Sequence, residues 1–387
     1  MLVDIRYRGG FLTDTSIPGE RKSDRVIPAH GNGALRASHR RWIVFASTLD
    51  PSGWDAVKSI IYQIRSDAPD GPVLNEGLVC PAISGWDPLN EGATLRKVHG
   101  MPMAFGTPKG ALRDGLPIPG ANVFVVKWYR RPLLELNGHL YQSHQHLDIW
   151  PDGPSMNHRL LRVEWMQFRL NDAEDDIEIL QPPQQLRQQG YEEGEAFCSH
   201  GPGCFMNHAM TPPVPDEGDI DWISCESFKG TEASGHKTHG QFAPVRYRWD
   251  SDSGLYQWTE TGPLTSVEGR ALGETSISRV DDHWIVAARS FTKDGSTFWY
   301  RSTNPFESLG EPIARMGDWG PRHSYRCADG QLRLFYSDKD PDPDLGSRNP
   351  LRVVDVDPQT CAYSEPRVIA DLKKAGLPFH HPFADMA

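Results

Sequence analysis

The stretch at residues 273–312 reads GETSISRVDDHWIVAARSFTKDGSTFWYRSTNPFESLGEP, and it decides the expected fold. Apolar and polar residues alternate within it, as at Trp284 and Val286, and this two-residue period is typical of β-strands. The Asp294-Gly295 pair between two such runs is typical of a tight hairpin turn. The stretch therefore predicts several short antiparallel strands that are joined by polar turns.

The same order of strands and turns recurs along the chain, with a spacing of about 40–60 residues. We recognise six such units, at residues 28–73, 98–130, 140–180, 204–261, 273–312 and 322–366. Units of this length are typical of propeller blades, each of which is a sheet of four strands. We therefore expect an all-β chain that folds as a six-bladed β-propeller. Another blade number, a β-sandwich with long loops and a pair of β domains are the alternatives.

The composition supports one large β domain. The chain has 387 residues, and its 36 glycines and 32 prolines argue against long helices. We expect residues 1–387 to form a single propeller domain, with residues 1–24 as an N-terminal lead-in that helps to close the last blade. No apolar run approaches the ~18 residues of a membrane span, so we expect no membrane association.

The charge balance indicates which partners and which compartment to expect. Lysine and arginine number 40 against 51 acidic residues, which gives a net charge of −11. This charge repels nucleic acid, so we expect no nucleic-acid partner. The six cysteines form no CxxC pair, as expected for reduced thiols, and the start MLVDIRYRGG has no apolar signal segment. We therefore expect a cytoplasmic protein, although a trimmed secreted or periplasmic chain would look the same.

The repeat also predicts where the chemistry occurs. In a propeller the first strand of each blade lines a central channel, so residues at the start of these strands meet at one channel mouth. The units place polar or titratable residues there, namely His30, His99, His144, His146, Asn207, His208, Glu274, Arg322, His323 and Tyr325. Histidine titrates near neutral pH, so such a ring is suited to proton transfer. We expect no cofactor, and a divalent metal held by imidazoles is the alternative.

Several segments resemble those of a known group of enzymes. The runs Ser290–Trp299 and Ser66–Gly71 are loosened aspartate boxes, which carry a Ser-x-Asp-x-Gly pattern. Together with the repeat they resemble the sialidase-like superfamily, also called BNR-repeat proteins. Glu274 and Arg289 resemble the family's glutamate and arginine on successive strands. The run at residues 25–28, Arg-Val-Ile-Pro, resembles its Arg-Ile-Pro opening.

The resemblance implies a carbohydrate-active enzyme with a β-propeller fold. It implies a glycoside hydrolase, a sialidase-like exo-glycosidase that acts on an acidic or uronic-acid-containing glycan at the channel mouth. Tyr325 would be the nucleophile, with Glu274 accepting its proton, because Tyr325 resembles the family's tyrosine segment. The proton for the departing oxygen would come from Asp50 or Asp55, or from His30 or His208. The residues expected to bind substrate are Arg25, Arg289, Arg322, His99, His144, His146, Asn207 and His323.

Two other functions remain open at this point. A polysaccharide or uronide lyase would use Arg289 or Arg322 to neutralise a carboxylate, a channel histidine as the base and Tyr325 as the acid. A propeller that binds sugars without catalysis would instead rely on exposed aromatic residues, and Trp54, Trp150, Trp222 and Trp319 lie in loop-like sequence. The acidic stretch at residues 171–178 is expected to be a solvated turn.

Overall fold

The chain is described by a computed structural model in which strands dominate. The described residues are 33–47, 59–69, 71–81, 83–86, 94–136, 139–142, 162–190, 212–216, 220–228, 240–270, 272–290, 296–315, 322–337 and 350–370. Within these ranges, no helix is long and apolar enough to cross a membrane.

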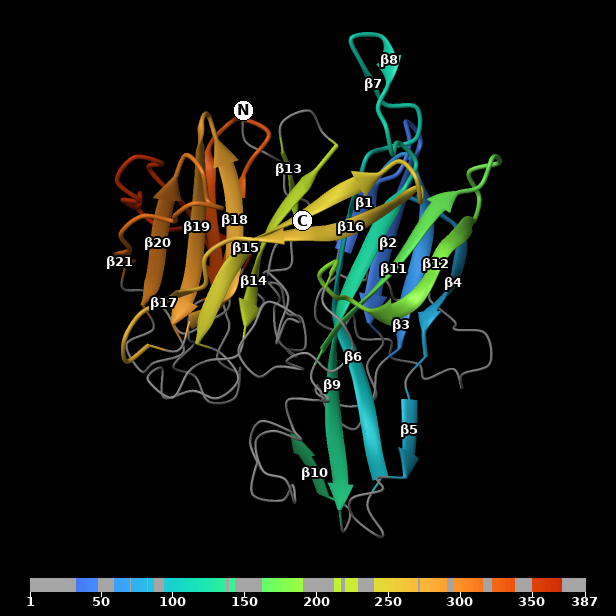
Figure 1. Cartoon of the computed structure of the whole chain (residues 1–387), viewed down its shortest axis with the longest axis horizontal. Helices are drawn as coiled ribbons and strands as arrows, with labels where there is room; N and C mark the ends of the chain where they lie inside the picture. The colour runs from blue at the N-terminus through green and yellow to red at the C-terminus, as the bar shows by residue number, and fades with distance from the viewer. Residues whose placement is uncertain are drawn as a thin grey trace.

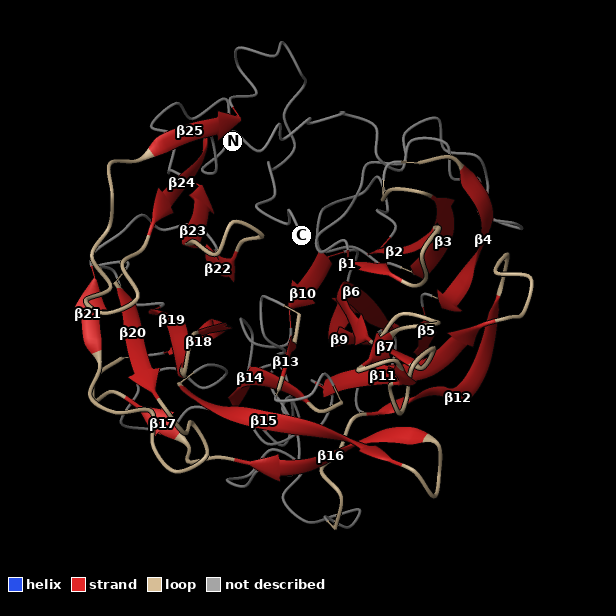
Figure 2. Ribbon diagram, turned by 90° about the horizontal axis from the view of Figure 1, so that it is seen from above, coloured by secondary structure: helices blue, strands red, loops and turns tan. Residues whose placement is uncertain are grey.

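Five antiparallel sheets surround a common axis (Figures 1 and 2). Blade one consists of β1 (Gly33–Arg36), β2 (Arg41–Ser47), β3 (Ile60–Ser66) and β4 (Val73–Cys80). Blade two consists of β5 (Ile83–Trp86), β6 (Thr94–Gly106), β9 (Phe124–Leu136), β10 (His139–Gln142), β11 (Arg162–Leu170) and β12 (Ile177–Gln185). A small hairpin of β7 (Leu112–Arg113) and β8 (Leu116–Pro117) connects β6 to β9.

The other three blades follow in chain order. Blade three consists of β13 (Val214–Pro215), β14 (Trp222–Phe228), β15 (Gln241–Asp250), β16 (Leu255–Thr261) and β17 (Thr265–Ser266). Blade four consists of β18 (Leu272–Val280), β19 (His283–Ser290), β20 (Thr297–Ser302) and β21 (Ile313–Arg315). Blade five consists of β22 (Arg322–Arg326), β23 (Leu332–Ser337), β24 (Leu351–Asp355) and β25 (Arg367–Ala370).

The propeller fold is confirmed, but the expected number of six blades is wrong, because the described sheets form five. The units at residues 98–130 and 140–180 were expected to be separate blades. Instead β9 pairs with β6 along one edge and with β11 along the other, so both units belong to one sheet. β6 and β9 have 13 residues each, long enough for each to pair with more than one neighbour. The expectation that residues 1–24 help to close the last blade lies outside the described residues.

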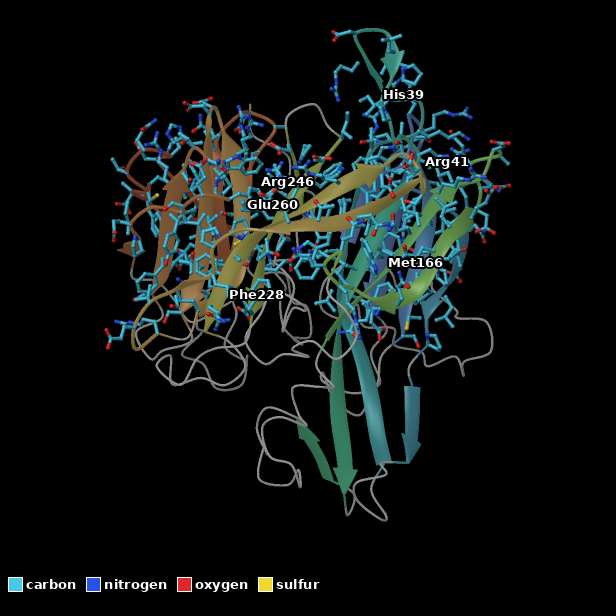
Figure 3. The ribbon with its side chains drawn as sticks, viewed as in Figure 1. His39, Arg41, Met166, Phe228, Arg246 and Glu260 are labelled. Carbon is cyan, nitrogen blue, oxygen red and sulfur yellow. The ribbon has the colours of Figure 1, made fainter. Side chains whose placement is uncertain are left out.

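Both faces of blades two, three and four are buried against neighbouring blades. Alternate residues of β9 show this, because Val126 packs in a core with blade one, whereas Val125 packs in a core with blade three. Figure 3 shows the side chains that fill these spaces, among them Met166 between blades one and two. Blades three and four, and blades four and five, share apolar cores of the same kind. Burial of apolar area in these four layers is the main favourable term for the fold.

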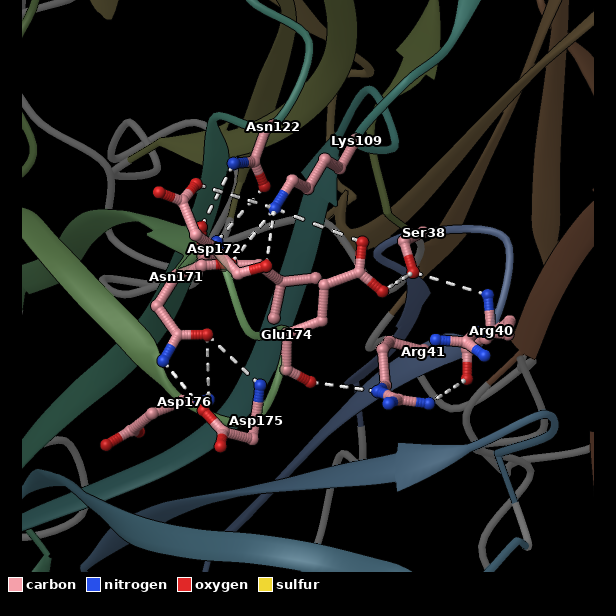
Figure 4. A network of polar contacts seen from close by, with 11 residues as sticks. Ser38, Arg40, Arg41, Lys109, Asn122, Asn171, Asp172, Glu174, Asp175 and Asp176 are labelled. Carbon is pink, nitrogen blue, oxygen red and sulfur yellow. Dashed lines mark hydrogen bonds and ion pairs between the residues drawn. The ribbon is translucent and has the colours of Figure 1, made fainter.

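An acidic turn of blade two, at residues 171–176, contacts blade one (Figure 4). Ser38 Oγ donates a hydrogen bond to Glu174 Oε2 at 2.8 Å, and Arg41 Nε donates to the backbone oxygen of Glu174 at 2.8 Å. The hydroxyl of Tyr62 donates to Asp176 Oδ1 at 2.7 Å. Burial and the neighbouring carboxylate of Asp176 raise the pKa of Tyr62. The stretch is a turn, as expected, but it also joins two blades.

A second polar group lies on blade three. Arg246 Nε donates to Glu260 Oε2 at 2.9 Å, and the two side chains lie next to each other in Figure 3. The same guanidinium forms an ion pair with Asp216, which follows β13. This arginine therefore connects three segments of one sheet, and a partly buried guanidinium with two carboxylates is a stable arrangement.

A buried ion pair joins blades two and three. Lys127 on β9 and Glu226 on β14 have fully buried side chains and form a direct contact. Ser224 Oγ donates to Glu226 Oε1 at 2.6 Å, and the Tyr247 hydroxyl lies 3.4 Å from the same oxygen. Burial lowers the pKa of Lys127, and the carboxylate of Glu226 opposes that shift. Each charge can remain in the interior only because the other is present.

We expect the substitution Lys127→Ala to lower the free energy of unfolding by about 3–5 kcal/mol, because it leaves a buried carboxylate without its partner. The double variant Lys127→Met with Glu226→Leu removes both charges and should recover most of that loss. Urea denaturation followed by tryptophan fluorescence measures both changes. If the double variant is as unstable as the single one, the loss of stability does not come from leaving the buried carboxylate of Glu226 without its partner.

Candidate functional site

Five predicted site residues with described side chains lie on blades four and five. They are Glu274 on β18, Arg289 on β19, and Arg322, His323 and Tyr325 on β22. β18 and β22 are the strands of their blades nearest to the axis in Figure 2, and they contact each other. Four of these five residues thus lie on axial strands, and Arg289 lies on the strand next to β18.

Glu274 occupies an irregular position at the start of β18. The register between β18 and β19 places Gly273 opposite Arg289, and then Ser276 opposite Ala287, so β18 contains one extra residue. Glu274 has a φ of 44°, in the left-handed region that residues with a side chain rarely adopt. Such a conformation costs roughly 1–2 kcal/mol, and strained residues outside ordinary turns cluster at functional sites. The bulge therefore marks this end of blade four as a candidate site.

An ion pair fixes the orientation of this glutamate. The Arg289 guanidinium contacts Glu274 Oε2. The two side chains are 14% and 18% exposed, so both remain accessible to water. The pair is mostly buried, so the cost of removing its charges from water offsets much of their attraction, and its net contribution to stability is small.

A second arginine reaches the same place from blade five. Arg289 lies opposite Thr297 in the register of β19 and β20, and Thr297 Oγ1 accepts a hydrogen bond from Arg322. Arg322 and Thr297 are almost fully buried. We call Glu274, Arg289, Thr297 and Arg322 the blade four/five cluster. It lies at the end of the blades where β18, β20 and β22 begin, which we call the entry end and which faces down in Figure 1.

Serine hydroxyls hold the two axial strands together above this cluster. Ser276 Oγ and Ser324 Oγ are 2.7 Å apart, and the Ser324 amide donates to Ser276 Oγ at 3.2 Å. Ser278 Oγ donates to the backbone oxygen of Ser324 at 3.3 Å. Because serine side chains are small, β18 and β22 approach each other closely. The hydrogen bonds between these serines hold the two strands at a fixed separation next to the blade four/five cluster.

His323 and Tyr325 lie on the other face of β22. Ser324 reaches toward blade four, and neighbouring residues of a strand point to opposite faces. The rings of His323 and Tyr325 stack with their centroids 6.4 Å apart and 8° between their planes, and Tyr325 meets Phe335 edge-on at 5.9 Å. The alternation of β22 therefore separates Tyr325 from the cluster, and the predicted proton transfer between Tyr325 and Glu274 stays a prediction.

Most of the other predicted site residues lie outside the described residues. They are Arg25, His30, Asp50, Asp55, His144, His146, Asn207 and His208. His99 lies on β6 opposite Arg130 in the register with β9. The histidine ring at the channel mouth thus stays a prediction. Among the described residues, no group of three or more histidine, cysteine, aspartate or glutamate residues could hold a metal ion.

The sequence did not reveal the parts of the site that depend on contacts between blades. Thr297 appeared only as part of an aspartate box, and the pairing of Ser276 with Ser324 was not expected. One sequence signal could have found Thr297. The hairpin turn predicted at Asp294-Gly295 implies that Arg289 and Thr297 lie opposite each other on the two strands. No sequence signal indicated that Arg322 of the next blade would bond to Thr297.

The sequence matches no protein-family model and no curated protein, but solved structures share the fold. A protein of unknown function from Dyadobacter fermentans superposes with a TM-score of 0.51 at 11% identity, over 92% of this chain and 88% of that one. Trypanosoma rangeli sialidase superposes with a TM-score of 0.52 at 8% identity, and a structure of it with sialic acid gives 0.51 at 8%. Each match covers 93% of this chain, which spans 52% of the sialidase. The fold is therefore a β-propeller similar to that of these solved structures.

We expect Glu274→Gly to leave the free energy of unfolding unchanged or to raise it by up to about 1 kcal/mol, because glycine adopts a positive φ without steric cost. Glu274→Val should lower it by more than 1 kcal/mol, because a β-branched residue fits that conformation poorly. Both variants lose the ion pair with Arg289, so that loss cancels in the comparison, and how well each residue tolerates the positive φ is the main contribution to the difference between them. Chemical denaturation measures it, and equal stabilities would contradict the positive φ.

Proposed function

We propose that this protein is a glycoside hydrolase that acts on an acidic or uronic-acid-containing glycan at the entry end of the propeller. The observation that carries the proposal is the blade four/five cluster. It holds the carboxylate of Glu274 on a strained bulge beside Arg289, with a second arginine from the next blade. A carboxylate and two guanidinium groups at the end of axial strands are suited to binding and cleaving an anionic sugar.

The arginines supply the recognition in this proposal. A guanidinium group binds a carboxylate through two parallel hydrogen bonds, which a lysine cannot do. Arg289 is partly exposed and would contact the sugar carboxylate, while Arg322 is buried and supports it through Thr297. Support from a buried group keeps the binding geometry fixed, and this lowers the entropy cost of reaction.

Glu274 supplies the proton transfer in this proposal. Hydrolysis needs an acid that protonates the departing oxygen and a group on the other face that attacks the sugar or activates water. Glu274 would donate its proton to the departing oxygen as the glycosidic bond breaks, and water would add its hydroxyl to the anomeric carbon. The proton that this water releases would pass to solvent, from which Glu274 is protonated again. We leave Tyr325 out of this machinery, because the alternation of β22 directs it away from the cluster.

The structural neighbours support an acidic sugar as the ligand class. One solved neighbour is a sialidase in complex with sialic acid, which is itself an acidic sugar. The likeness to this sialidase concerns the fold alone. We propose the ligand class from the two arginines of this chain, because a guanidinium group binds a carboxylate.

Elimination is the second candidate, and one observation favours it. Hydrolysis commonly uses two carboxyl groups, whereas Glu274 is the one carboxylate of the blade four/five cluster in the described part of the chain. A uronide lyase needs a single base to remove a carbon-bound proton, an acid for the leaving oxygen and a cation that neutralises the carboxylate.

We expect Glu274→Gln to lower turnover of an acidic glycan by about 10²–10⁴-fold, because the amide cannot transfer a proton. Its melting temperature should stay close to that of the unsubstituted protein. Tyr325→Phe is the matched control and should keep most of the activity. Initial rates and thermal melts test both variants. Full activity in Glu274→Gln, or a loss restricted to Tyr325→Phe, would contradict the assignment.

Product analysis separates the two reactions. Hydrolysis of a uronic-acid glycan should create a new reducing end without the ultraviolet absorbance of an unsaturated uronate. Reducing-sugar assays and absorbance on the same sample measure both quantities. A rise in absorbance with each cleavage would show elimination and would replace the hydrolase proposal. Binding of the glycan without any product would show a sugar-binding propeller.

A further inference from the structure

A threonine next to Glu274 ties β18 to blade three. Thr275 Oγ1 donates a hydrogen bond to the backbone oxygen of Cys225 on β14. In the register of β14 and β15, Cys225 lies opposite Pro244, and proline has no N–H that it could donate to that oxygen. The Thr275 hydroxyl therefore supplies a donor that the opposite residue of β15 cannot supply.

The next residue ties β18 to the blade on the other side. Ser276 Oγ is 2.7 Å from Ser324 Oγ on β22 of blade five, and it accepts a hydrogen bond from the Ser324 amide at 3.2 Å. Neighbouring residues of a strand point to opposite faces, so Thr275 and Ser276 reach opposite neighbours of blade four. Both residues and their partners, Cys225 and Ser324, are fully or almost fully buried. Their hydrogen bonds thus lie away from water, where such bonds are stronger.

These two anchors follow directly after the strained residue of the bulge. In the register of β18 and β19, Glu274 and Thr275 together lie opposite the single residue Ala288. A bulge whose first residue has a left-handed backbone ordinarily carries glycine there, whereas here glutamate has a φ of 44°. A strained conformation of this kind persists only where the surrounding structure fixes it. Hydrogen bonds from residues 275 and 276 to two different blades fix the backbone at this point.

We propose that Thr275 and Ser276 are positioning residues, whose hydrogen bonds to blades three and five hold Glu274 in its left-handed conformation and so direct its carboxylate to the substrate. This inference rests on the proposed function, in which Glu274 donates the proton. Both hydroxyls are buried, so they act through Glu274 and not on the sugar. Without either anchor the start of β18 would be free to relax toward an extended conformation, and the carboxylate would leave its place beside Arg289.

The first test compares two substitutions of Thr275. Thr275→Val removes the hydroxyl and keeps the shape of the side chain. We expect it to lower kcat on an acidic glycan about 10–100-fold, because a small displacement of a catalytic group has an effect of that size. KM should change by less than about twofold, because Arg289 keeps its place on β19 and still binds the sugar carboxylate. Thr275→Ser keeps the hydroxyl, so its kcat should stay within about threefold of the unsubstituted protein.

Ser278→Ala is the matched control. Ser278 Oγ donates to the backbone oxygen of Ser324 at 3.3 Å, so it also joins β18 to blade five, but it lies four residues beyond Glu274. Its kcat should stay within about twofold of the unsubstituted protein. An equal fall in kcat in Ser278→Ala and Thr275→Val would show a general loosening of β18 and would overturn the proposal. Equal activities of Thr275→Val and Thr275→Ser, or a rise in KM with an unchanged kcat, would overturn it as well.

A second measurement is independent of activity. Glu274→Gly relieves the strain of the bulge, and in the unsubstituted protein it should leave the urea midpoint unchanged or raise it. In Thr275→Val the bulge has already relaxed, so the same glycine substitution should shift the midpoint to a lower value than it does in the unsubstituted protein. The effects of Thr275→Val and Glu274→Gly are therefore expected not to add, whereas those of Ser278→Ala and Glu274→Gly should add. Additive effects in the first pair would overturn the proposal.

The test remains possible if Thr275→Val does not fold. Ser276→Ala then takes its place in both measurements with the same expectations, because it releases β18 from the other neighbouring blade.

Failure of this proposal can be told from failure of the proposed function. Turnover that depends on Glu274 but not on Thr275 would refute the positioning role alone. A protein without turnover of acidic glycans would refute the hydrolase, and the urea midpoints would then decide about the anchors. Coupling between Thr275 and Glu274 would retain them as the groups that hold the bulge, and additivity would refute them.

Discussion

Burial of both faces of the inner sheets is the constraint on which the rest of this structure depends. Alternate residues of a strand must serve two different cores, as Val125 and Val126 of β9 do. Polar side chains buried within the strands, such as Ser276 and Lys127, have partners in the next blade, and groups that meet solvent gather at strand ends and turns. Glu274 and Arg289 follow this rule, because they lie where β18 begins and β19 ends. The location of the candidate site is thus a consequence of the packing.

Two ion pairs of the molecule differ in how far they are buried. We assign a structural role to the fully buried pair and a proposed functional role to the other. Lys127 and Glu226 are fully buried between two blades, so their mutual attraction is needed to keep either of them charged. Glu274 and Arg289 are mostly buried, but part of each side chain remains open to water. The first pair makes the contact between blades two and three specific. In the proposed function, the second pair supplies the carboxylate and the guanidinium that meet a charged sugar.

The sequence predicts strands well and their distant partners poorly. In blade four the alternation of Trp284 and Val286 identified β19, and both side chains are buried. The number of blades could not be obtained in this way, because the strand pattern does not show that β9 pairs with both β6 and β11. In the candidate site, too, contacts within one hairpin could be predicted and contacts between sheets could not. Glu274 and Arg289 lie on one hairpin and were found together, whereas the bond from Arg322 to Thr297 links two sheets.

The identity of residue 274 argues for a role beyond the fold. Glycine would adopt the positive φ of the bulge without strain, and asparagine or aspartate tolerates it better than glutamate does. Aspartate would also keep the negative charge, but its side chain is one methylene shorter and would have to approach Arg289 more closely. Glutamate at this position thus combines an unfavourable backbone with the longer reach to the guanidinium. Because desolvation offsets much of the attraction in this mostly buried ion pair, we attribute that combination to the proposed role of a carboxylate at the entry end.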